Sequence, residues 1–519
     1  MSDSSVISSM KLLGGKFGEQ PIQRQIRLLL IFFAVALVAK GGAVLRGFAV
    51  DDYAFGQGFN KGELGVFLTQ GRFLLGALDW GIDSLGVNIN DLYISLGLCA
   101  LLLQAALVVA ILRFVGAANA PGAALIGSAM VIHPYLSEIL TFRMVLPGYC
   151  VAAALSIVAL EAASSKSSGL RKHIICMLAT LGMLFVYQGF LNYFAVAIIF
   201  AFLFEAFSVT KYAKAPRESA RSRNYVVLAI ICALSALMFL AILATFKRVG
   251  FIEPTGRSKF ISLHEIPERV AQVWALFQNV FWKNEPITPH WLKLVIGLPV
   301  VIGIAVLFQR FTKIFRSGST LHLLGIALAV ALLIPATVGV IVPFKDWYPV
   351  ARVLPQIPVI LGLIILLSAP FLKSILNGWI FRISTAMIAF TVFAFILINN
   401  QIFADQQRVN GWDRMEANRI VSRLEQRPDF LKVQFVYVGG GSWRHSARMS
   451  MIQGDMNISA FSPEYSKVPL LVEVSGYNFK KASGDQNAVG EAYCAKAAPW
   501  PDVEAVTVVD GLAIICLAQ

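Results

Sequence analysis

Long apolar stretches separated by short polar segments occupy most of residues 26–400. A helix of about 20 apolar residues crosses the ~30 Å hydrocarbon core of a bilayer. The first stretch has no small-residue cleavage pattern, so we interpret it as an uncleaved anchor. The pattern predicts an all-α polytopic membrane protein of about 11 transmembrane helices. The predicted spans are 26–45, 91–112, 120–139, 145–163, 173–188, 190–209, 224–245, 292–309, 320–342, 353–370 and 383–400.

Two segments between the predicted spans carry apolar residues at helical spacing, with polar residues between them. The segment 46–90 contains GELGVFLTQGRFLLGALDW, and the segment 247–291 contains HEIPERVAQVWALFQNVFW, which is rich in Trp and Phe. This periodicity is typical of amphipathic helices that lie in the plane of the membrane interface. We predict such a helix in each segment.

The pattern changes after residue 400, because no further apolar run is long enough to span a bilayer. NGWDRMEANRIVSRLEQR has helical periodicity, and VQFVYVGG is typical of a buried strand that ends at glycine. AVTVVDGLAIICLA contains two β-rich runs joined by Asp510 and Gly511, a favoured hairpin turn. Residues 401–519 therefore predict a small water-exposed α+β domain.

Composition supports the membrane assignment and suggests its orientation. Hydrophobic residues make up 57% of the chain and charged residues 14%, which excludes a water-soluble globule. The net charge of +14 is scattered between apolar runs, so it does not indicate nucleic-acid binding. Lys and Arg exceed Asp and Glu on the side that holds residues 1–25, whereas the two signs nearly balance on the other side. The positive-inside rule then places the N-terminus in the cytoplasm and the 401–519 domain outside.

Polar and ionisable side chains gather at the outer ends of the predicted spans. Asp51 and Asp52 come directly after the first span, where a solvated loop is the simplest alternative to a functional role. Convergent polar groups on one side of a membrane predict an outward-facing cavity. Its other predicted members are Arg72, His133, Glu138, Arg143, Tyr187, Gln188, Lys345, Asp346, Trp347 and Arg352.

Lys40 lies inside the first predicted span. An ionisable residue at the centre of such a helix costs roughly 2.5–3.5 kcal/mol. Two interpretations are open: its ammonium group extends to the interface, or it holds the phosphate of a lipid.

The cysteines and short motifs suggest one disulfide and no nucleotide or metal site. Cys494 and Cys516 both lie in the 401–519 domain, and we predict a disulfide between them if that domain faces an oxidising compartment; two separate thiols are the alternative. No phosphate-binding glycine loop and no Cys or His cluster with metal-ligand spacing occurs in the sequence. SWRHSARM collects Arg444, His445 and Arg448, which we interpret as a solvated basic loop without chemistry.

Several of these features together resemble one family. An Asp-Asp pair just past the first span, the motif Gln70-Gly71-Arg72-Phe73, the pair Tyr187-Gln188 and the overall architecture are similar to the Gtr-type, serotype-converting O-antigen glucosyltransferases. The resemblance implies a GT-C membrane glycosyltransferase of the bacterial inner membrane. It also implies a polyprenyl-phosphate donor, usually undecaprenyl-phosphate glucose, and the lipopolysaccharide O-antigen as periplasmic acceptor. A donor synthase and a small flippase would be its functional partners.

The chemistry of such a transfer assigns tasks to these residues. An acceptor hydroxyl must lose a proton as it attacks the anomeric carbon, and we predict that Asp51 or Asp52 is the general base. The leaving phosphate requires cations, for which Arg72, Arg143, Lys345 and Arg352 are candidates, with Lys40 nearer the lipid. Gln70, Tyr187 and Gln188 are further substrate-binding candidates. No cofactor is expected, although Mg²⁺ or Mn²⁺ between two acids and a phosphate is the alternative.

Structural roles compete with these assignments. Arg72 could anchor a helix at the membrane surface, and Tyr187 and Gln188 could form ordinary hydrogen bonds between helices. At the level of function, one alternative is a transporter or flippase for a lipid-linked sugar, which predicts an internal repeat and discontinuous helices. Another is a different lipid-sugar enzyme, such as an O-antigen polymerase or ligase or an aminoarabinose transferase.

Overall fold

The computed structural model describes residues 21–55, 61–165, 169–207, 224–253, 259–282, 289–316, 320–339, 341–372, 378–440 and 458–518. The basic segment with Arg444, His445 and Arg448 lies outside these residues. The helices are α2 (Pro21–Lys40), α3 (Val50–Phe55), α4 (Lys61–Thr69), α5 (Phe73–Ser84), α6 (Tyr93–Phe114), α7 (Ala123–Val131), α8 (Tyr135–Thr141), α9 (Leu146–Ser164), α10 (Leu170–Val186), α11 (Phe190–Ala206), α13 (Tyr225–Arg248), α14 (Ile266–Phe281), α15 (His290–Arg316), α16 (Thr320–Val338), α17 (Ile357–Leu372), α18 (Trp379–Glu425), α19 (Lys467–Ser475) and α20 (Asp485–Cys494). The strands are β1 (Phe435–Gly439), β2 (Lys480–Lys481), β3 (Val506–Val509) and β4 (Leu512–Cys516).

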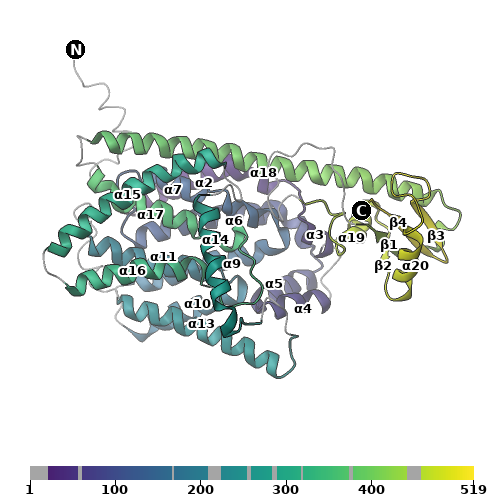
Figure 1. The fold of residues 1–519 in the computed structure, drawn as a ribbon, viewed down its shortest axis with the longest axis horizontal. Helices are drawn as coiled ribbons and strands as arrows, with labels where there is room; N and C mark the ends of the chain where they lie inside the picture. Colours follow the sequence, from purple (N-terminus) through teal and green to yellow (C-terminus); the bar gives the residue numbers. More distant parts are fainter. Residues whose placement is uncertain are drawn as a thin grey trace, which may run out of the picture.

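Most of the chain forms a helical bundle, and the C-terminal residues form a small α+β domain at one end of it (Figure 1). The main hydrophobic core lies between α2, α6, α7, α9, α11 and α17, and it contains side chains such as Phe32, Leu101 and Phe194. A second core fills the C-terminal domain and also includes Phe48 and Tyr53, which flank the acidic pair. The segment after the first helix is therefore packed into the C-terminal domain.

The helices fit a membrane protein, while the number of crossings stays a prediction. Among the described residues, six helices are long and apolar enough to cross a bilayer, or seven if the bent pair α7 and α8 is one span. Three shorter apolar helices cover Phe190–Ala206, Leu323–Val338 and Ile357–Leu372. Helical residues coincide with each of the eleven predicted stretches. Length and composition identify fewer than eleven of them as spans.

The predicted span 120–139 is not one straight helix. α7 and α8 are bent by 43° where His133 and Pro134 interrupt them. Proline removes a backbone donor and disfavours helical geometry in the residue before it. The break leaves carbonyl groups at the end of α7 that need donors from elsewhere.

The last predicted span is part of a much longer helix. The sequence predicts a span that ends at residue 400 and a helix over 410–427, but α18 has 47 residues and runs through both without a break. At 1.5 Å per residue it is roughly 70 Å long, which is about twice the thickness of the hydrocarbon core. It follows the whole length of the molecule and joins the bundle to the sheet (Figure 1).

Buried polar side chains explain why α18 continues. The side-chain amide of Asn399 donates to the Ile132 carbonyl (2.6 Å), and that of Gln406 donates to the Thr141 carbonyl (3.0 Å). Asp413 accepts from the backbone amide of Ala460 in the C-terminal domain (2.8 Å). Buried polar groups need such partners, so this stretch is held as a helix against both parts of the molecule.

The two predicted amphipathic helices are present, but they differ in environment. α14 leaves Ile266, Val270, Trp274 and Phe281 exposed, as expected at a membrane interface. In the segment 46–90, α4 and α5 form, and α5 buries Leu75 completely. α5 packs on α9 and α10, so it is part of the bundle and not a helix that floats on the surface.

The C-terminal domain contains a four-stranded sheet in the order β2-β1-β4-β3. β1 is parallel to β2 and β4, and β3 and β4 form an antiparallel hairpin. The hairpin turns at Asp510 and Gly511, whose φ angles are 48° and 79°. Positive φ at both positions is the requirement that Asp-Gly satisfies in a two-residue turn.

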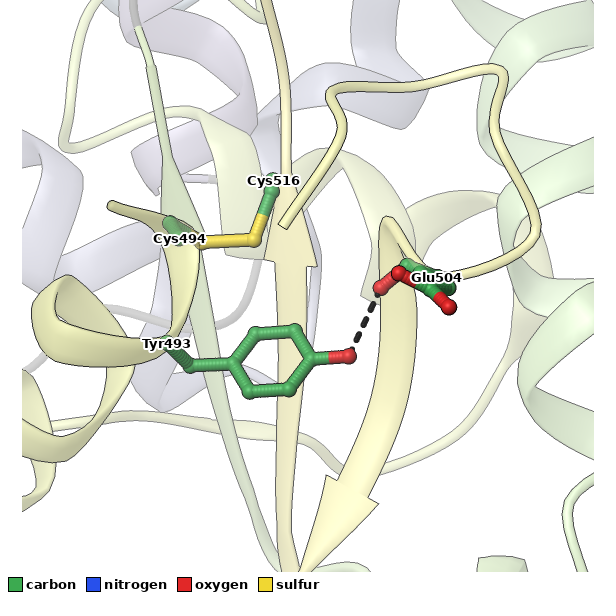
Figure 2. Close-up of a disulfide and its surroundings, with 4 residues drawn as sticks. All are labelled: Tyr493, Cys494, Glu504 and Cys516. Carbon is green, nitrogen blue, oxygen red and sulfur yellow. Dashed lines mark hydrogen bonds between the residues drawn. A yellow bond between two sulfur atoms is a disulfide. The ribbon is translucent and has the colours of Figure 1, made fainter. Parts of the chain in front are cut away.

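Cys494 and Cys516, the pair predicted from the sequence, form a disulfide with 5.3 Å between the Cα atoms. The bond joins the end of α20 to the end of β4 (Figure 2). Beside it, the Tyr493 hydroxyl donates to the Glu504 carbonyl (2.9 Å), which ties α20 to the segment before β3.

Candidate functional site

The turn between α4 and α5 places Gln70 and Arg72 beside the end of α10. Gly71 has a φ of +73°, and a Cβ there would lie 2.8 Å from the Phe239 ring, so this turn requires glycine. The Arg72 guanidinium lies over the Tyr187 ring at 5.0 Å, and the Gln188 side-chain amide donates to the Gln70 carbonyl (2.9 Å). Two motifs far apart in the sequence are thereby joined.

These residues line a cavity of about 110 Å³, which we call the polar cavity. Six of the residues singled out from the sequence lie in its wall: Gln70, Arg72, Tyr187, Gln188, Asp346 and Arg352. The other lining residues are Gly189, Ile341, Phe344, Tyr348, Val350 and Val353. Sequence reasoning missed Tyr348, although its position in DWYPVAR between Asp346 and Arg352 was a usable signal.

In the wall of the polar cavity, a carboxylate and two aromatic rings hold the Arg352 side chain. Its backbone amide donates to Glu138 Oε2 (2.7 Å), and its Nη1 donates to Glu138 Oε1. The guanidinium also lies 4.7 Å above the Phe142 ring and 5.6 Å from the Tyr348 ring. Because Glu138 is buried, its role in this arrangement is to orient Arg352.

An apolar groove, which we call the lateral groove, opens next to the polar cavity. It has a volume of about 420 Å³ and lies between α10, α11, α13 and α16. Its wall consists mainly of small and aliphatic side chains, including Ala195, Ala233 and Leu332. Gln188 and Phe344 line both the groove and the polar cavity, so the two spaces are neighbours that share these side chains as a common wall.

The two carboxylates of the acidic pair have different environments. Asp52 is fully buried, and it accepts from the backbone amides of Ala49 (2.8 Å) and Met144 (3.0 Å). Burial raises the pKa of Asp52 to about 7, although these amides and Arg143 oppose the shift. Asp52 thus holds α3 against the segment that leads into α9.

Asp51 is only partly buried and faces the C-terminal domain. Its Oδ1 accepts from the Tyr465 hydroxyl (2.7 Å), and nearby the Arg46 guanidinium pairs with Glu473 (3.0 Å). α3 therefore lies between the bundle and α19 (Figure 1). The described lining of the polar cavity contains neither Asp51 nor Asp52.

Three other predicted site residues hold the backbone together. Lys40 is fully buried, and its Nζ donates to the carbonyls of Val131 (2.9 Å) and His133 (3.2 Å), where α7 ends. The His133 ring accepts from the Tyr135 amide (3.2 Å). Lys40 therefore satisfies the carbonyls left by the break, a role that neither interpretation of the sequence included.

Arg143 is also buried, and it is not among the described lining residues of the polar cavity. Its guanidinium donates to the carbonyls of Gly47 (3.0 Å), Leu45 (2.6 Å) and Ala43. Arg143 thus fixes the loop that leads to the acidic pair, because three carbonyls of that segment accept from its guanidinium. In the structure Arg143 anchors that loop through these carbonyls.

Lys345 and Trp347 lie near the polar cavity but face other surroundings. Trp347 is covered by the Arg269 guanidinium at 4.8 Å, and the same Arg269 donates to the Lys345 carbonyl (3.0 Å). Lys345 lines a second, more basic depression instead. Within the described part of the chain, no group of three or more His, Cys, Asp or Glu side chains is placed to hold a metal ion.

Comparison with known proteins adds an independent finding. The family model described as Glucosyl transferase GtrII matches residues 47–369, more than half of the chain. No curated protein matches the chain. The matched range begins just before Asp51 and ends in α17, so it contains the acidic pair, the polar cavity and the lateral groove. The chain belongs to the GtrII glucosyl transferase family.

Proposed function

We propose that the protein is an inverting glucosyltransferase that transfers glucose from a polyprenyl-phosphate donor to lipopolysaccharide O-antigen on the periplasmic face of the inner membrane. Family membership supports glucosyl transfer, and the apolar helices support a reaction at a membrane. The proposal assigns the donor, the acceptor and the residues that act on them.

One observation carries the choice of donor: the lateral groove meets a cavity that contains two arginines. An isoprenoid chain suits the apolar wall of the groove, while its phosphate suits Arg72 and Arg352, since guanidinium groups bind phosphate through two parallel hydrogen bonds. The shared residues Gln188 and Phe344 would then lie where the chain ends and the phosphate begins. A soluble sugar nucleotide would have no use for the groove.

Asp51 is the better candidate for the general base. The Asp52 carboxylate is buried and bonded to backbone amides, whereas Asp51 lies partly exposed on the same short helix. The segment 142–144 joins α3 to the polar cavity, because Met144 donates to Asp52 while Phe142 lies under Arg352. We assign proton removal to Asp51 and the placement of α3 to Asp52.

In this proposal the glucosyl transfer is a single displacement at the anomeric carbon. The acceptor hydroxyl oxygen forms a bond to the anomeric carbon and gives its proton to Asp51. The bond from that carbon to the phosphate oxygen breaks, and its electron pair stays on the phosphate, where Arg72 and Arg352 stabilise the charge. A single displacement inverts the anomeric centre, so a β-linked donor gives an α-linked product.

Separate Asp51→Asn and Asp52→Asn variants test these roles. We expect Asp51→Asn to fold normally and to transfer glucose roughly 10²–10⁴-fold more slowly, since a general base is lost. Asp52→Asn should lower thermal stability while the folded fraction stays active. The assay uses full-length protein in membranes, labelled polyprenyl-phosphate glucose and O-antigen acceptor.

Asp91→Asn is the matched control, because it makes the same change at an exposed carboxylate. Full activity in folded Asp51→Asn protein would refute the base assignment. Transfer from a soluble sugar nucleotide, with none from the polyprenyl-phosphate donor, would refute the donor assignment.

A transporter for a lipid-linked sugar is the second candidate, because such proteins contain discontinuous helices and α7 and α8 form a broken pair. In a transporter the carbonyls freed by a break coordinate the transported ion or substrate. Here Lys40 occupies those of Val131 and His133. This contact and the family membership favour the enzyme.

A further inference from the structure

A second cationic depression, which we call the basic cleft, lies apart from the polar cavity. Its volume is about 720 Å³, and it lies between the end of α13, the segment that leads into α14 and the loop before α17. Three lysines, an arginine and a histidine contribute to its lining: Lys247, Lys259, Lys345, Arg248 and His264. None of its described lining residues belongs to the polar cavity or to the lateral groove.

Backbone hydrogen bonds bring two of these cations together. The Lys345 amide donates to the Lys259 carbonyl (2.8 Å), and the Ile261 amide donates to the Pro343 carbonyl (3.0 Å). The rings of Phe260 and Phe344 stack beside this bridge at 5.7 Å. The backbone pairing brings two lysines to one edge of the cleft, where their like charges would attract an anion.

The acid in the basic cleft is already engaged. Glu265 is the single acidic residue among the described lining residues, and it accepts from the amide (2.7 Å) and the hydroxyl (2.6 Å) of Ser262. These two donors lower the pKa of Glu265, and the nearby charges of Lys345 and His264 lower it further. The carboxylate completes a capping box with Ser262 at the 3₁₀ turn Leu263–Glu265, which comes directly before α14. The Lys and Arg side chains of the cleft outnumber this single acid.

Helix electrostatics explain only part of this charge. Lys247 and Arg248 lie in the last turn of α13, where the helix dipole favours cations. Lys259 and Lys345 lie outside any helix, so that account does not apply to them.

Exposed apolar side chains border the basic cleft. Val249 is 68% exposed, Phe251 61%, and Leu263 86%. A phosphate ion from water would gain nothing from these side chains, whereas acyl chains would cover them. Cations beside exposed apolar groups are the arrangement that binds anionic lipid at a membrane surface.

We propose that the basic cleft binds the phosphate of an anionic membrane lipid, with Lys259 and Lys345 as its principal ligands. The site is distinct from the donor phosphate site, because no described residue lines both: Phe260 lines the basic cleft, and Phe344, which stacks on it, lines the polar cavity. The inference goes beyond the proposed function and does not depend on it. A lipid bound here would also hold the loop that carries Asp346 and Arg352.

Lipid binding by the full-length protein tests the proposal. Native mass spectrometry of detergent-purified protein would measure the affinity for phosphatidylglycerol and for phosphatidylcholine. We expect preferential binding of phosphatidylglycerol, and roughly tenfold weaker binding in the Lys259→Gln/Lys345→Gln variant, since two surface cations are removed. The Lys480→Gln/Lys496→Gln variant, with the same charge change on the exposed surface of the C-terminal domain, should bind like the unmodified protein.

Three results would overturn the proposal. The first is equal binding of phosphatidylglycerol and phosphatidylcholine. The second is an equal loss of affinity in both double variants, which would indicate a general charge effect. The third is inhibition of phosphatidylglycerol binding by inorganic phosphate or pyrophosphate at concentrations equal to that of the lipid, which would indicate a site for free anions.

Discussion

The end of the first helix and the wall of the polar cavity both contain charged side chains, but these side chains have different partners. Near the first helix, Lys40 and Arg143 donate to backbone carbonyls, and Asp52 accepts from backbone amides. In the cavity wall, Arg72 and Arg352 contact aromatic rings and a carboxylate. The difference teaches that the same type of cation supports the fold where backbone carbonyls surround it, and lines a cavity where aromatic rings and a carboxylate hold it.

Removal of Arg143 should have the largest effect on stability. Arg143→Gln leaves several carbonyls without their donor and Asp52 without its neighbouring cation. We therefore expect the free energy of unfolding to fall by about 3–5 kcal/mol. Thermal unfolding of the purified protein would measure it. Arg46→Gln, in the loop that Arg143 holds, breaks an exposed pair with Glu473 and should cost less than about 1 kcal/mol. Equal effects of the two changes would contradict the comparison.

Removal of Arg352 should affect the reaction more than the fold. If it stabilises the leaving phosphate, Arg352→Gln should reduce kcat roughly 10²–10³-fold. The change also leaves Glu138 buried without its cation, so Glu138→Gln/Arg352→Gln is the necessary companion. We expect the double variant to regain thermal stability while transfer stays low. Recovery of transfer in the double variant would mean that Arg352 is only a structural partner of Glu138.

Asp79 is a buried acid for which, among the described residues, neither a backbone amide nor a cation is found at Oδ1. It is buried on α5, and its Oδ1 has no hydrogen-bond partner among the described residues. Burial raises the pKa of Asp79 to about 8. Between about pH 4 and 8 the folded protein keeps a proton that the unfolded chain has already released, so this contribution to stability is lost as the pH rises across that range.

Asp79→Asn should remove this dependence, which amounts to at most about 1.4 kcal/mol per pH unit. Thermal unfolding measured from pH 5 to pH 8 would report it, with Asp83→Asn on the same helix as the control. The variant should gain stability relative to the unmodified protein as the pH increases. Parallel stability profiles of the Asp79→Asn variant and the unmodified protein would show that Asp79 is ionised in the folded state.

Local patterns in the sequence were sufficient for some parts of this molecule. Apolar runs locate the helices, because burial or lipid contact requires them. Asp510 and Gly511 specify a hairpin, since few other pairs accept positive φ at both positions. Gln70, Arg72, Tyr187 and Gln188 were identified from short motifs, and the structure brings them to one cavity.

Only the tertiary structure decided the environment of the other site residues, because their partners lie far away in the sequence. Whether Asp51 or Asp52 is accessible depends on Met144 and Tyr465, which lie far away in the sequence. Whether Lys40 meets lipid or protein depends on the break at Pro134, and the course of α18 past residue 400 depends on partners such as Ile132 and Ala460. Residue type determines which hydrogen bonds and charges a side chain can offer. The folded chain alone determines which groups accept them and whether any space remains for a ligand.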